Sequence, residues 1–349
     1  MNFTFSDEQT MMADVARQLL TDTCDPAALR AQMASGAARD DARWGAIAET
    51  GLTGVLAPET AGGMGLSEPD FVLIAEAAGF VALPEPLVEH AGVAAPLLAA
   101  AAPEHPLLAE AASGAATLAV GHPTNPFVAD ADTAAALLLD HQGEVHLVPR
   151  GAVALVREPS IDPFRRLFRV DWTPTDATRL TSAEIGRPLW DAALDRGALF
   201  AAAQCLGLAQ RSIDLAVAYA KERQQFGKPI GSYQAVKHLI ASAQVAVEFA
   251  RPVVHAAAAD LHRASPQSRA RISHAKIVAA EAADLAARTS IQVHGAMGYS
   301  WEVDVHLFLK RALALTYAWG DPAFHRARVE ARVFGQPIGA DQTFSHEAA

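Results

Sequence analysis

One segment in the second half of the chain constrains the fold more than any other. The stretch PLWDAALDRGALFAAAQCLGLAQRSIDLAVAYAKERQQFG, residues 188–227, is rich in Ala and Leu and predicts one long helix. Further helical segments follow at residues 232–264, 268–295 and 303–320. Long helices joined by short turns favour an antiparallel bundle. Another helix is expected to start near Pro322.

The segment before this bundle has a different pattern. The short apolar or alternating runs ATLAVG, AALLLD, EVHLVP, VALVRE and LFRVDW are separated by the turn-forming stretches HPTNP, HQGE and REPSIDP. This alternation predicts a small β domain. The segment has neither the βαβ alternation nor the GxGxxG fingerprint of a Rossmann domain.

The first part of the chain is predicted to be helical, and a capping box formed by Ser6 and Gln9 would open its first helix. The predicted fold class is therefore α+β and mainly α. We expect a helical domain at residues 1–115, a shortened β domain at 116–182 and a helical bundle at 183–349.

Composition excludes several classes of protein. The formal net charge is −11 and no basic stripe is visible, so a nucleic-acid partner is not expected. Cys24 and Cys205 are far apart and have neither disulfide nor metal-site spacing, so we expect two buried small side chains and no metal. The N-terminus lacks a basic and an apolar stretch, and no apolar run resembles a membrane span. We therefore expect a cytoplasmic protein with no membrane partner.

Two glycine-containing turns carry the functional signal. In ERQQFGKPIGSYQAVKHLIA, Arg223 ends a helix beside Phe226, and a cation next to an aromatic ring suits a phosphate and an adjacent flat ring. In QVHGAMGYSWE, Gly295 and Gly298 would let backbone N–H groups approach an anion closely. Each motif alone is weak, because a solvated Arg and a core Phe would look the same.

Together and in this order, the motifs resemble those of the acyl-CoA dehydrogenase family over almost the whole chain. The stretches WGAIAETGLTGVLAPETAGGMGLS and AKIVAAEAADLAARTSIQVHGAMGYSWE carry the same resemblance. It implies a helical domain, a β domain and a four-helix bundle in that order. Members of the family bind FAD and oxidise an acyl-CoA thioester to the trans-2-enoyl-CoA. A carboxylate takes the α-proton, the β-hydride passes to flavin N5, and an electron-transfer flavoprotein usually accepts the electrons.

The resemblance also implies which residues hold the cofactor. In the first turn, the residues that match family positions holding the pyrophosphate and adenosine half of FAD across a subunit interface are Arg223, Gln225, Phe226 and Gln234. In the second turn, the residues that match the glycine turn holding the same half from the neighbouring subunit are Gln292, His294, Gly295 and Gly298. One departure is Ala296, where the family usually has Gly. A larger one is GHPTNPFVADADTAAALLL, which lacks the TEPxxGSD-like segment that holds the flavin ring. We expect the adenosine end to be held well and the ring poorly.

The catalytic base is missing from both of its known positions. Most members place a Glu before a Gly after the second turn, and the matching residue is Trp319, whose indole accepts no proton. A minority place the Glu in the preceding long helix, where the match is Gly197. Asp195 matches a position that contacts acyl-CoA, although the Arg that usually assists it is Ala198. Two helical residues rotate by roughly 200°, so Asp195 should point away from the position of Gly197.

Other groups are weaker candidates for the base. Asp321 lies close to Trp319, but the sequence DPAFHRARVEARV is typical of an Asp that caps a helix starting at Pro322. Structural roles are the better interpretation of Glu248, His294 and His306. Glu302, which follows the second glycine turn, is a remoter candidate for the base.

Three hypotheses follow. In the first, the chain is one subunit of a heteromeric dehydrogenase and a sister chain supplies the flavin-ring contacts and the Glu. The stretch HGAMGYSWEVDVHLFLKRA resembles the corresponding stretch in the shorter subunits of paired dehydrogenases. Such pairs, including heterotetramers, act on bulky acyl-CoA esters in lipid or steroid catabolism. In the second, a self-sufficient homo-oligomer uses an unusual base such as Asp321. In the third, the chain is a relative without turnover.

Overall fold

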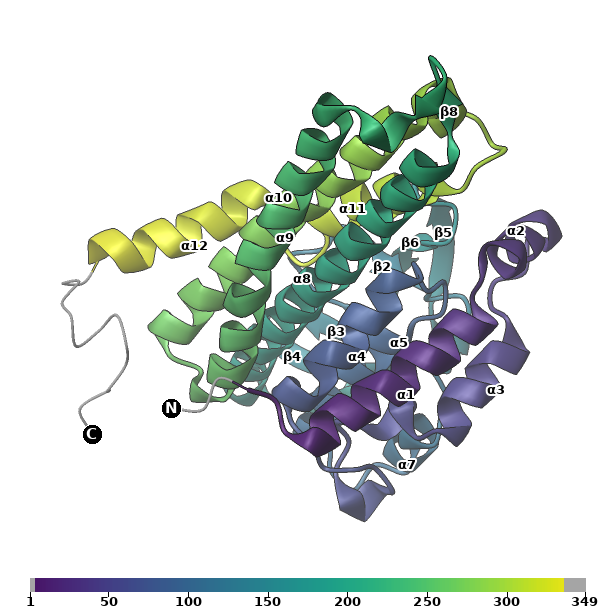
Figure 1. The fold of residues 1–349 in the computed structure, drawn as a ribbon. Helices are drawn as coiled ribbons and strands as arrows, with labels where there is room; N and C mark the ends of the chain where they lie inside the picture. Colours follow the sequence, from purple (N-terminus) through teal and green to yellow (C-terminus); the bar gives the residue numbers. More distant parts are fainter. Residues whose placement is uncertain (1–3, 336–349) are drawn as a thin grey trace.

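The computed structural model describes residues 4–335 and has the predicted order of helices, strands and helices (Figure 1). The helices are α1 (Asp7–Thr23), α2 (Pro26–Ser35), α3 (Asp41–Glu49), α4 (Glu68–Phe80), α5 (Leu87–Glu89), α6 (Ala95–Ala101), α7 (Leu107–Ala112), α8 (Ala183–Glu222), α9 (Gln234–Asp260), α10 (Pro266–His294), α11 (Val305–Tyr317) and α12 (Pro322–Gly335). The strands are β1 (Leu118–Gly121), β2 (Val128–Ala129), β3 (Ala136–His141), β4 (Glu144–Pro149), β5 (Ala154–Glu158), β6 (Leu167–Asp171), β7 (Arg179–Thr181), β8 (Gln224–Gln225) and β9 (Lys228–Pro229).

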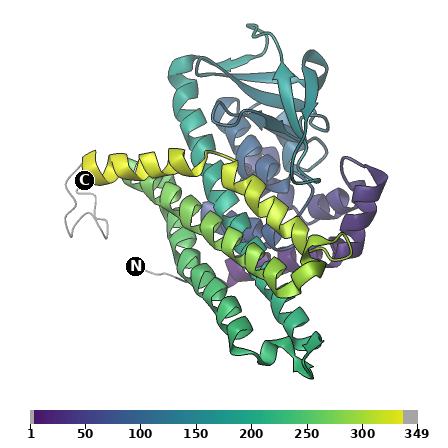
Figure 2. The ribbon, with the colours of Figure 1, turned by 90° about the horizontal axis from the view of Figure 1, so that it is seen from above.

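Helix α8 is the centre of the molecule. It contains 40 residues and packs against α4, α9, α10 and α11 as well as strand β4. Helices α8 to α11 lie side by side as the bundle, while α12 points away from it (Figures 1 and 2). The predicted mainly α fold with a C-terminal bundle is therefore confirmed, and α12 begins at the expected Pro322.

The N-terminal helices join the bundle where α4 crosses α8 at very short range. A Cβ atom added to Gly207 of α8 would lie 1.9 Å from the carbonyl oxygen of Glu76 in α4. A Cβ atom on Gly79 of α4 would lie 2.0 Å from the carbonyl oxygen of Gln204 in α8. Because any side chain at either glycine would overlap the other backbone, the two helices can pack this closely only with glycine at both positions.

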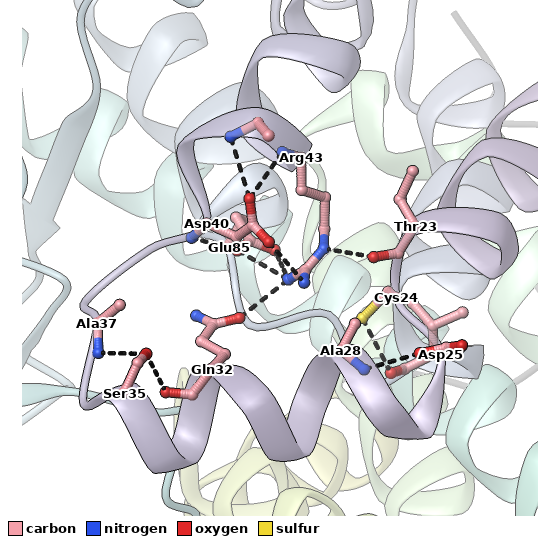
Figure 3. Close-up of polar contacts among 12 residues, drawn as sticks. Thr23, Cys24, Asp25, Ala28, Gln32, Ser35, Ala37, Asp40, Arg43 and Glu85 are labelled. Atoms are coloured by element: carbon pink, nitrogen blue, oxygen red, sulfur yellow. Dashed lines mark hydrogen bonds and ion pairs between the residues drawn. The ribbon is translucent and has the colours of Figure 1, made fainter.

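A buried ion pair organises the far end of the N-terminal domain (Figure 3). The Arg43 guanidinium donates to Glu85 at 2.8 Å, to the side-chain oxygen of Gln32 at 3.0 Å and to the carbonyl of Thr23 at 3.0 Å. These contacts connect α1, α2 and α3 to the segment before α5. The neighbouring Cys24 has a pKa raised to about 12 by burial, so it remains a thiol and packs as a small apolar side chain.

The β domain consists of two small sheets with the strand orders β1-β3-β4-β7 and β2-β6-β5. All five predicted strand segments are present as β1, β3, β4, β5 and β6. Strands β2 and β7 were not predicted; each is very short. The two sheets enclose their own small core, which includes Leu137, Val148 and Phe168. Figure 2 shows this domain on one side of the helices.

The ends of the predicted segments can be compared with the structure. The Ser6–Gln9 capping box is present, with the Ser6 N–H donating to the Gln9 side chain at 2.9 Å. The seven strands of the β domain lie between Leu118 and Thr181, while the proposed domain boundaries at 115 and 182 stay a prediction. Residues 336–349 of the proposed last domain lie outside the described residues. Within residues 4–335, no helix is long and apolar enough to cross a membrane.

The Arg43–Glu85 pair gives a testable stability prediction. We expect Glu85→Gln to lower the free energy of unfolding by about 3 kcal/mol, because it leaves the buried Arg43 without its counter-charge. Asp41→Asn is the matched control, since Asp41 pairs with Arg39 at 2.8 Å but is 84% exposed. The control should cost less than about 1 kcal/mol in urea unfolding. Equal losses in the two variants would contradict this account of the network.

Candidate functional site

The first glycine turn forms an exposed hairpin at one end of the bundle. Arg223 is the C-cap of α8, and β8 and β9 follow as a two-stranded hairpin. The turn needs two residues of positive φ, Phe226 at 52° and Gly227 at 80°. The Phe226 ring is 92% exposed, and among the described residues no acidic group pairs with the Arg223 side chain. The hairpin therefore offers an unpaired cation and an uncovered aromatic ring.

The second glycine turn ends helix α10. Gly295 has a φ of 60°, and a Cβ atom at this position would have no atom within 4 Å, so its backbone is open to approach by a ligand. His294 lies beneath it, donates from Nδ1 to the Ser290 carbonyl at 2.7 Å and has a pKa lowered by burial. Ala296, the departure from the family pattern, does not have a positive φ, so alanine causes no backbone strain there.

The two turns lie together and form one surface, here called the cofactor corner (residues 223–234 and 292–298). The rings of Tyr219 and His294 stack with their centroids 4.2 Å apart. Val293 packs with Ala216 and Ala220 of α8 in a small buried cluster. The structure therefore places the two turns next to each other, and their binding role stays a prediction for the eight residues that they carry: Arg223, Gln225, Phe226, Gln234, Gln292, His294, Gly295 and Gly298. Gln225, Gln234 and Gln292 are exposed there.

A second feature is the turn that follows α11, formed by residues 318–320 and here called the Trp319 turn. The Trp319 side chain is buried, with 3% of its surface exposed, and its φ is 60°. The backbone N–H of Trp319 donates to Asn125 Oδ1 at 2.7 Å, and its backbone carbonyl accepts from His325 Nε2 at 3.0 Å. Just before the turn, the buried Lys276 ammonium donates to the carbonyls of Leu315 at 2.6 Å and Thr316 at 3.0 Å.

The Trp319 indole rests directly on Gly197 of α8. A Cβ atom at Gly197 would lie 2.1 Å from Trp319 Cδ2 and 2.5 Å from both Cε2 and Cε3. Only glycine leaves room for the ring at this distance. The two residues, more than a hundred positions apart in sequence, thus fill one and the same space between α8 and the Trp319 turn.

The two histidines beside Trp319 are neutral, and both ring nitrogens of each form hydrogen bonds. Burial lowers the pKa of His122 to about 4; its Nε2–H donates to the Trp190 carbonyl and its Nδ1 accepts from the Thr124 N–H. Burial also lowers the pKa of His325 to about 4, and its Nδ1 accepts from the Ser273 hydroxyl. With both nitrogens of each ring occupied, neither histidine has a free lone pair with which to remove a proton.

Comparison with known proteins agrees with this architecture. The model described as the acyl-CoA dehydrogenase N-terminal domain matches residues 6–105, and that of the C-terminal domain matches residues 186–334. The chain is 33% identical over 332 residues to the acyl-CoA dehydrogenase IpdE2 of Mycobacterium tuberculosis, covering 95% of this chain and 99% of IpdE2. The chain belongs to the acyl-CoA dehydrogenase family.

Solved structures give the same fold. A chain of the ChsE4–ChsE5 complex from Mycobacterium tuberculosis superimposes with a TM-score of 0.84 at 23% identity, covering 97% of this chain and 100% of that one. The Tcur3481–Tcur3483 steroid acyl-CoA dehydrogenase superimposes with a TM-score of 0.80 at 24% identity, covering 93% and 96%. The predicted membership of this family of acyl-CoA oxidoreductases is therefore confirmed, and FAD is the family cofactor.

Within the family, the contact between Trp319 and Gly197 acquires a specific meaning. The sequence comparison with the family assigned the alternative glutamate positions to these two residues, and in the structure they touch. A buried indole thus stands at one of these positions and rests on a glycine at the other. The Asp321 carboxylate accepts from the Phe324 N–H at 2.7 Å and thereby caps α12. The expected capping role is observed.

Asp195, the predicted substrate contact, is held by two arginines. Its carboxylate accepts from Arg328 at 2.6 Å and lies 3.4 Å from Arg269, and its side chain is buried. Burial raises its pKa, against the opposing effect of both arginines. Its role toward acyl-CoA stays a prediction. Glu248 accepts from the Gln244 side chain at 2.6 Å and His306 packs edge-on against Trp301, consistent with their structural interpretation. Glu302 is exposed.

Sequence reasoning missed the residues that hold the Trp319 turn. Asn125, Lys276 and His325 reach it from the β domain, α10 and α12. None of them stands in a motif. The one sequence signal was Lys276 in the mostly small and apolar stretch AKIVAAEAA, where an unpaired buried charge would be costly.

The neutral His325 predicts a dependence of stability on pH. Its folded-state pKa of about 4 is below the ordinary 6.5, so between these values the unfolded chain binds a proton that the folded chain does not. Stability contributed by this residue is complete above pH 6.5 and is lost as the pH falls toward 4. From pH 7 to 5 the wild type should lose about 2 kcal/mol more than His325→Gln in urea unfolding.

The exposed His262 provides the control, because His262→Gln should leave the pH dependence unchanged. An identical decrease in the wild type and in His325→Gln would refute the buried neutral state of His325.

Proposed function

We propose that this chain is a subunit of a FAD-dependent acyl-CoA dehydrogenase that lacks its own catalytic glutamate and works with a sister subunit. The reaction would be α,β-dehydrogenation of an acyl-CoA thioester to the 2-enoyl-CoA. The observation that carries the proposal is the buried Trp319 indole packed on Gly197, in the space where the family base belongs. A chain with no proton acceptor there needs one from elsewhere.

The cofactor corner supports a role toward a flavin shared between subunits. The Arg223 guanidinium would pair with a phosphate, the Phe226 ring would stack on the flat end of the cofactor, and the open Gly295 backbone would lie against it. Bound FAD supplies the hydride acceptor of the reaction. A ring that is 92% exposed in one chain is best explained by coverage in an assembly.

The residues of this chain fit the flavin ring less well than they fit the adenosine half of FAD. A cavity of about 450 Å³ lies beside α10, α11 and α12, and its rim cations are matched by acids: Arg326 pairs with Glu281, and Arg288 pairs with Asp284. The TEPxxGSD-like segment is absent. These features support a division of labour in which this chain contributes the adenosine side and the sister chain contributes the ring contacts.

The likeness to IpdE2 and to subunits of steroid acyl-CoA dehydrogenases supports a bulky acyl-CoA, including one derived from a steroid side chain, as the substrate class. A heterotetramer in the cytoplasm, delivering electrons to an electron-transfer flavoprotein, completes the proposal. Asp195, held by Arg328 and Arg269, would lie at the acyl-CoA site.

Co-expression tests the proposal directly. The chain purified alone should contain little FAD and should not dehydrogenate acyl-CoA. Co-expressed with a sister acyl-CoA dehydrogenase chain that carries the catalytic Glu, it should form a yellow hetero-oligomer that reduces an electron acceptor. An active homo-oligomer would instead support a base such as Asp321. A complex that holds stoichiometric FAD but turns over no acyl-CoA would favour an inactive relative.

Arg223 gives a test that does not depend on turnover. We expect Arg223→Ala to reduce the FAD content of the purified complex, read from the ratio of absorbance at 450 and 280 nm, because a charge-assisted bond to phosphate is lost and affinity drops about tenfold or more. Lys221→Ala is the matched control, as this exposed cation lies two residues away outside the cofactor corner. Unchanged FAD content in Arg223→Ala would refute the role of the corner.

A further inference from the structure

We propose that Trp319 is a built-in plug: its indole fills an apolar cavity over Gly197 that would otherwise admit a ligand group of similar size. The fit between the two residues is mutual. The ring is buried and its six-membered part lies against the helix backbone, with the nearest ring atom 2.1 Å from the position of a Gly197 Cβ. A large ring can reach a helix backbone this closely only where the helix has no side chain.

The Trp319 turn is held by contacts that do not involve the indole. Asn125 accepts from the Trp319 N–H and His325 donates to its carbonyl. Lys276 holds the two carbonyls of Leu315 and Thr316 that precede the turn. All of these bonds go to backbone atoms. The turn should therefore keep its position when the side chain at 319 is shortened, and the cavity should remain open.

Two neighbours of the indole, His122 and Gly197, carry no charge. The rings of His122 and Trp319 lie 5.8 Å apart, and His122 is in turn 5.7 Å from Trp190. Both nitrogens of His122 bond to backbone groups, so the face of its ring is what remains toward Trp319. Gly197 contributes only backbone. Such a wall suits an uncharged apolar group and disfavours a carboxylate or a phosphate.

The cavity also has an entrance. A pocket of about 430 Å³ lies between the segment 125–127, the segment 159–165 and helix α11. Two of its lining residues are Asn125 and Ala318, the hydrogen-bond partner and the chain neighbour of Trp319. Removing the indole would extend this open pocket inward as far as Gly197, so that a ligand could enter from solvent.

The inference rests on the proposed function only for the identity of the ligand that the plug excludes. In a dehydrogenase subunit, Trp319 would keep the reacting part of an acyl thioester out of this chain and confine turnover to the sister subunit. The plug itself is tested without FAD, partner or substrate. Its failure and the failure of the proposed function are therefore distinguishable.

The test uses indole as the probe. We expect 5 mM indole to raise the Tm of Trp319→Ala by at least about 2 °C, because a ligand that binds only the folded state stabilises it, and to change the wild-type Tm by less than about 0.5 °C. Trp301→Ala is the control, since Trp301 is 63% exposed and its loss opens no cavity. Its Tm should not respond to indole. No response of Trp319→Ala would overturn the proposal.

A second pair of variants keeps the proposal testable if Trp319→Ala does not fold. Gly197→Ala should lower the Tm strongly in the wild type, because the new methyl group overlaps the indole. The same change should have little effect in a Trp319→Leu background, where the ring is gone. Equal decreases in both backgrounds would show that Gly197 serves the helix rather than the plug, and would overturn the proposal.

Discussion

The architecture depends on very close contacts along α8, made possible by three glycines. A Cβ atom at Gly186 would lie 2.1 Å from the Gly143 carbonyl oxygen of the β domain, at Gly197 it would meet Trp319, and at Gly207 it would meet α4. One helix thus docks the β domain, the Trp319 turn and the N-terminal helices at successive points. Glycine costs helix stability of about 1 kcal/mol at each position, and the close packing it permits offsets this.

The sequence predicted the elements better than their contacts. The Ala- and Leu-rich run predicted one long helix at residues 188–227, while α8 spans Ala183–Glu222, so the helix was predicted but both of its ends lie five residues earlier. Five strands followed from their alternation. Strands β2 and β7 have two and three residues, too few for a period to be visible. Trp319 and Gly197 were each recognised as vacated positions, yet their mutual contact joins distant segments and no local pattern records it.

The aromatic rings in the two parts of the candidate site differ in solvent exposure. At the cofactor corner, an aromatic ring and a cation are left exposed at the tip of a rigid hairpin, as expected for a surface that is completed by another molecule. At the Trp319 turn, an aromatic ring is withdrawn from solvent into contact with a helix backbone. The chain is therefore open where the cofactor's adenosine half would bind and closed where the proton would be removed. The proposed role beside a sister subunit would account for this asymmetry, and not only for either feature alone.

The charged groups around the Trp319 turn already form hydrogen bonds with backbone atoms, which explains why an apolar side chain fits at position 319. The Lys276 ammonium, with a pKa lowered to about 8 by burial, is used by the α11 carbonyls. The Asp321 carboxylate is used by the first turn of α12, where Pro322 contributes no N–H. His325 is neutral. A carboxylate at position 319 would be buried as the indole is, and burial would raise its pKa. The apolar Trp319 side chain avoids this desolvation cost.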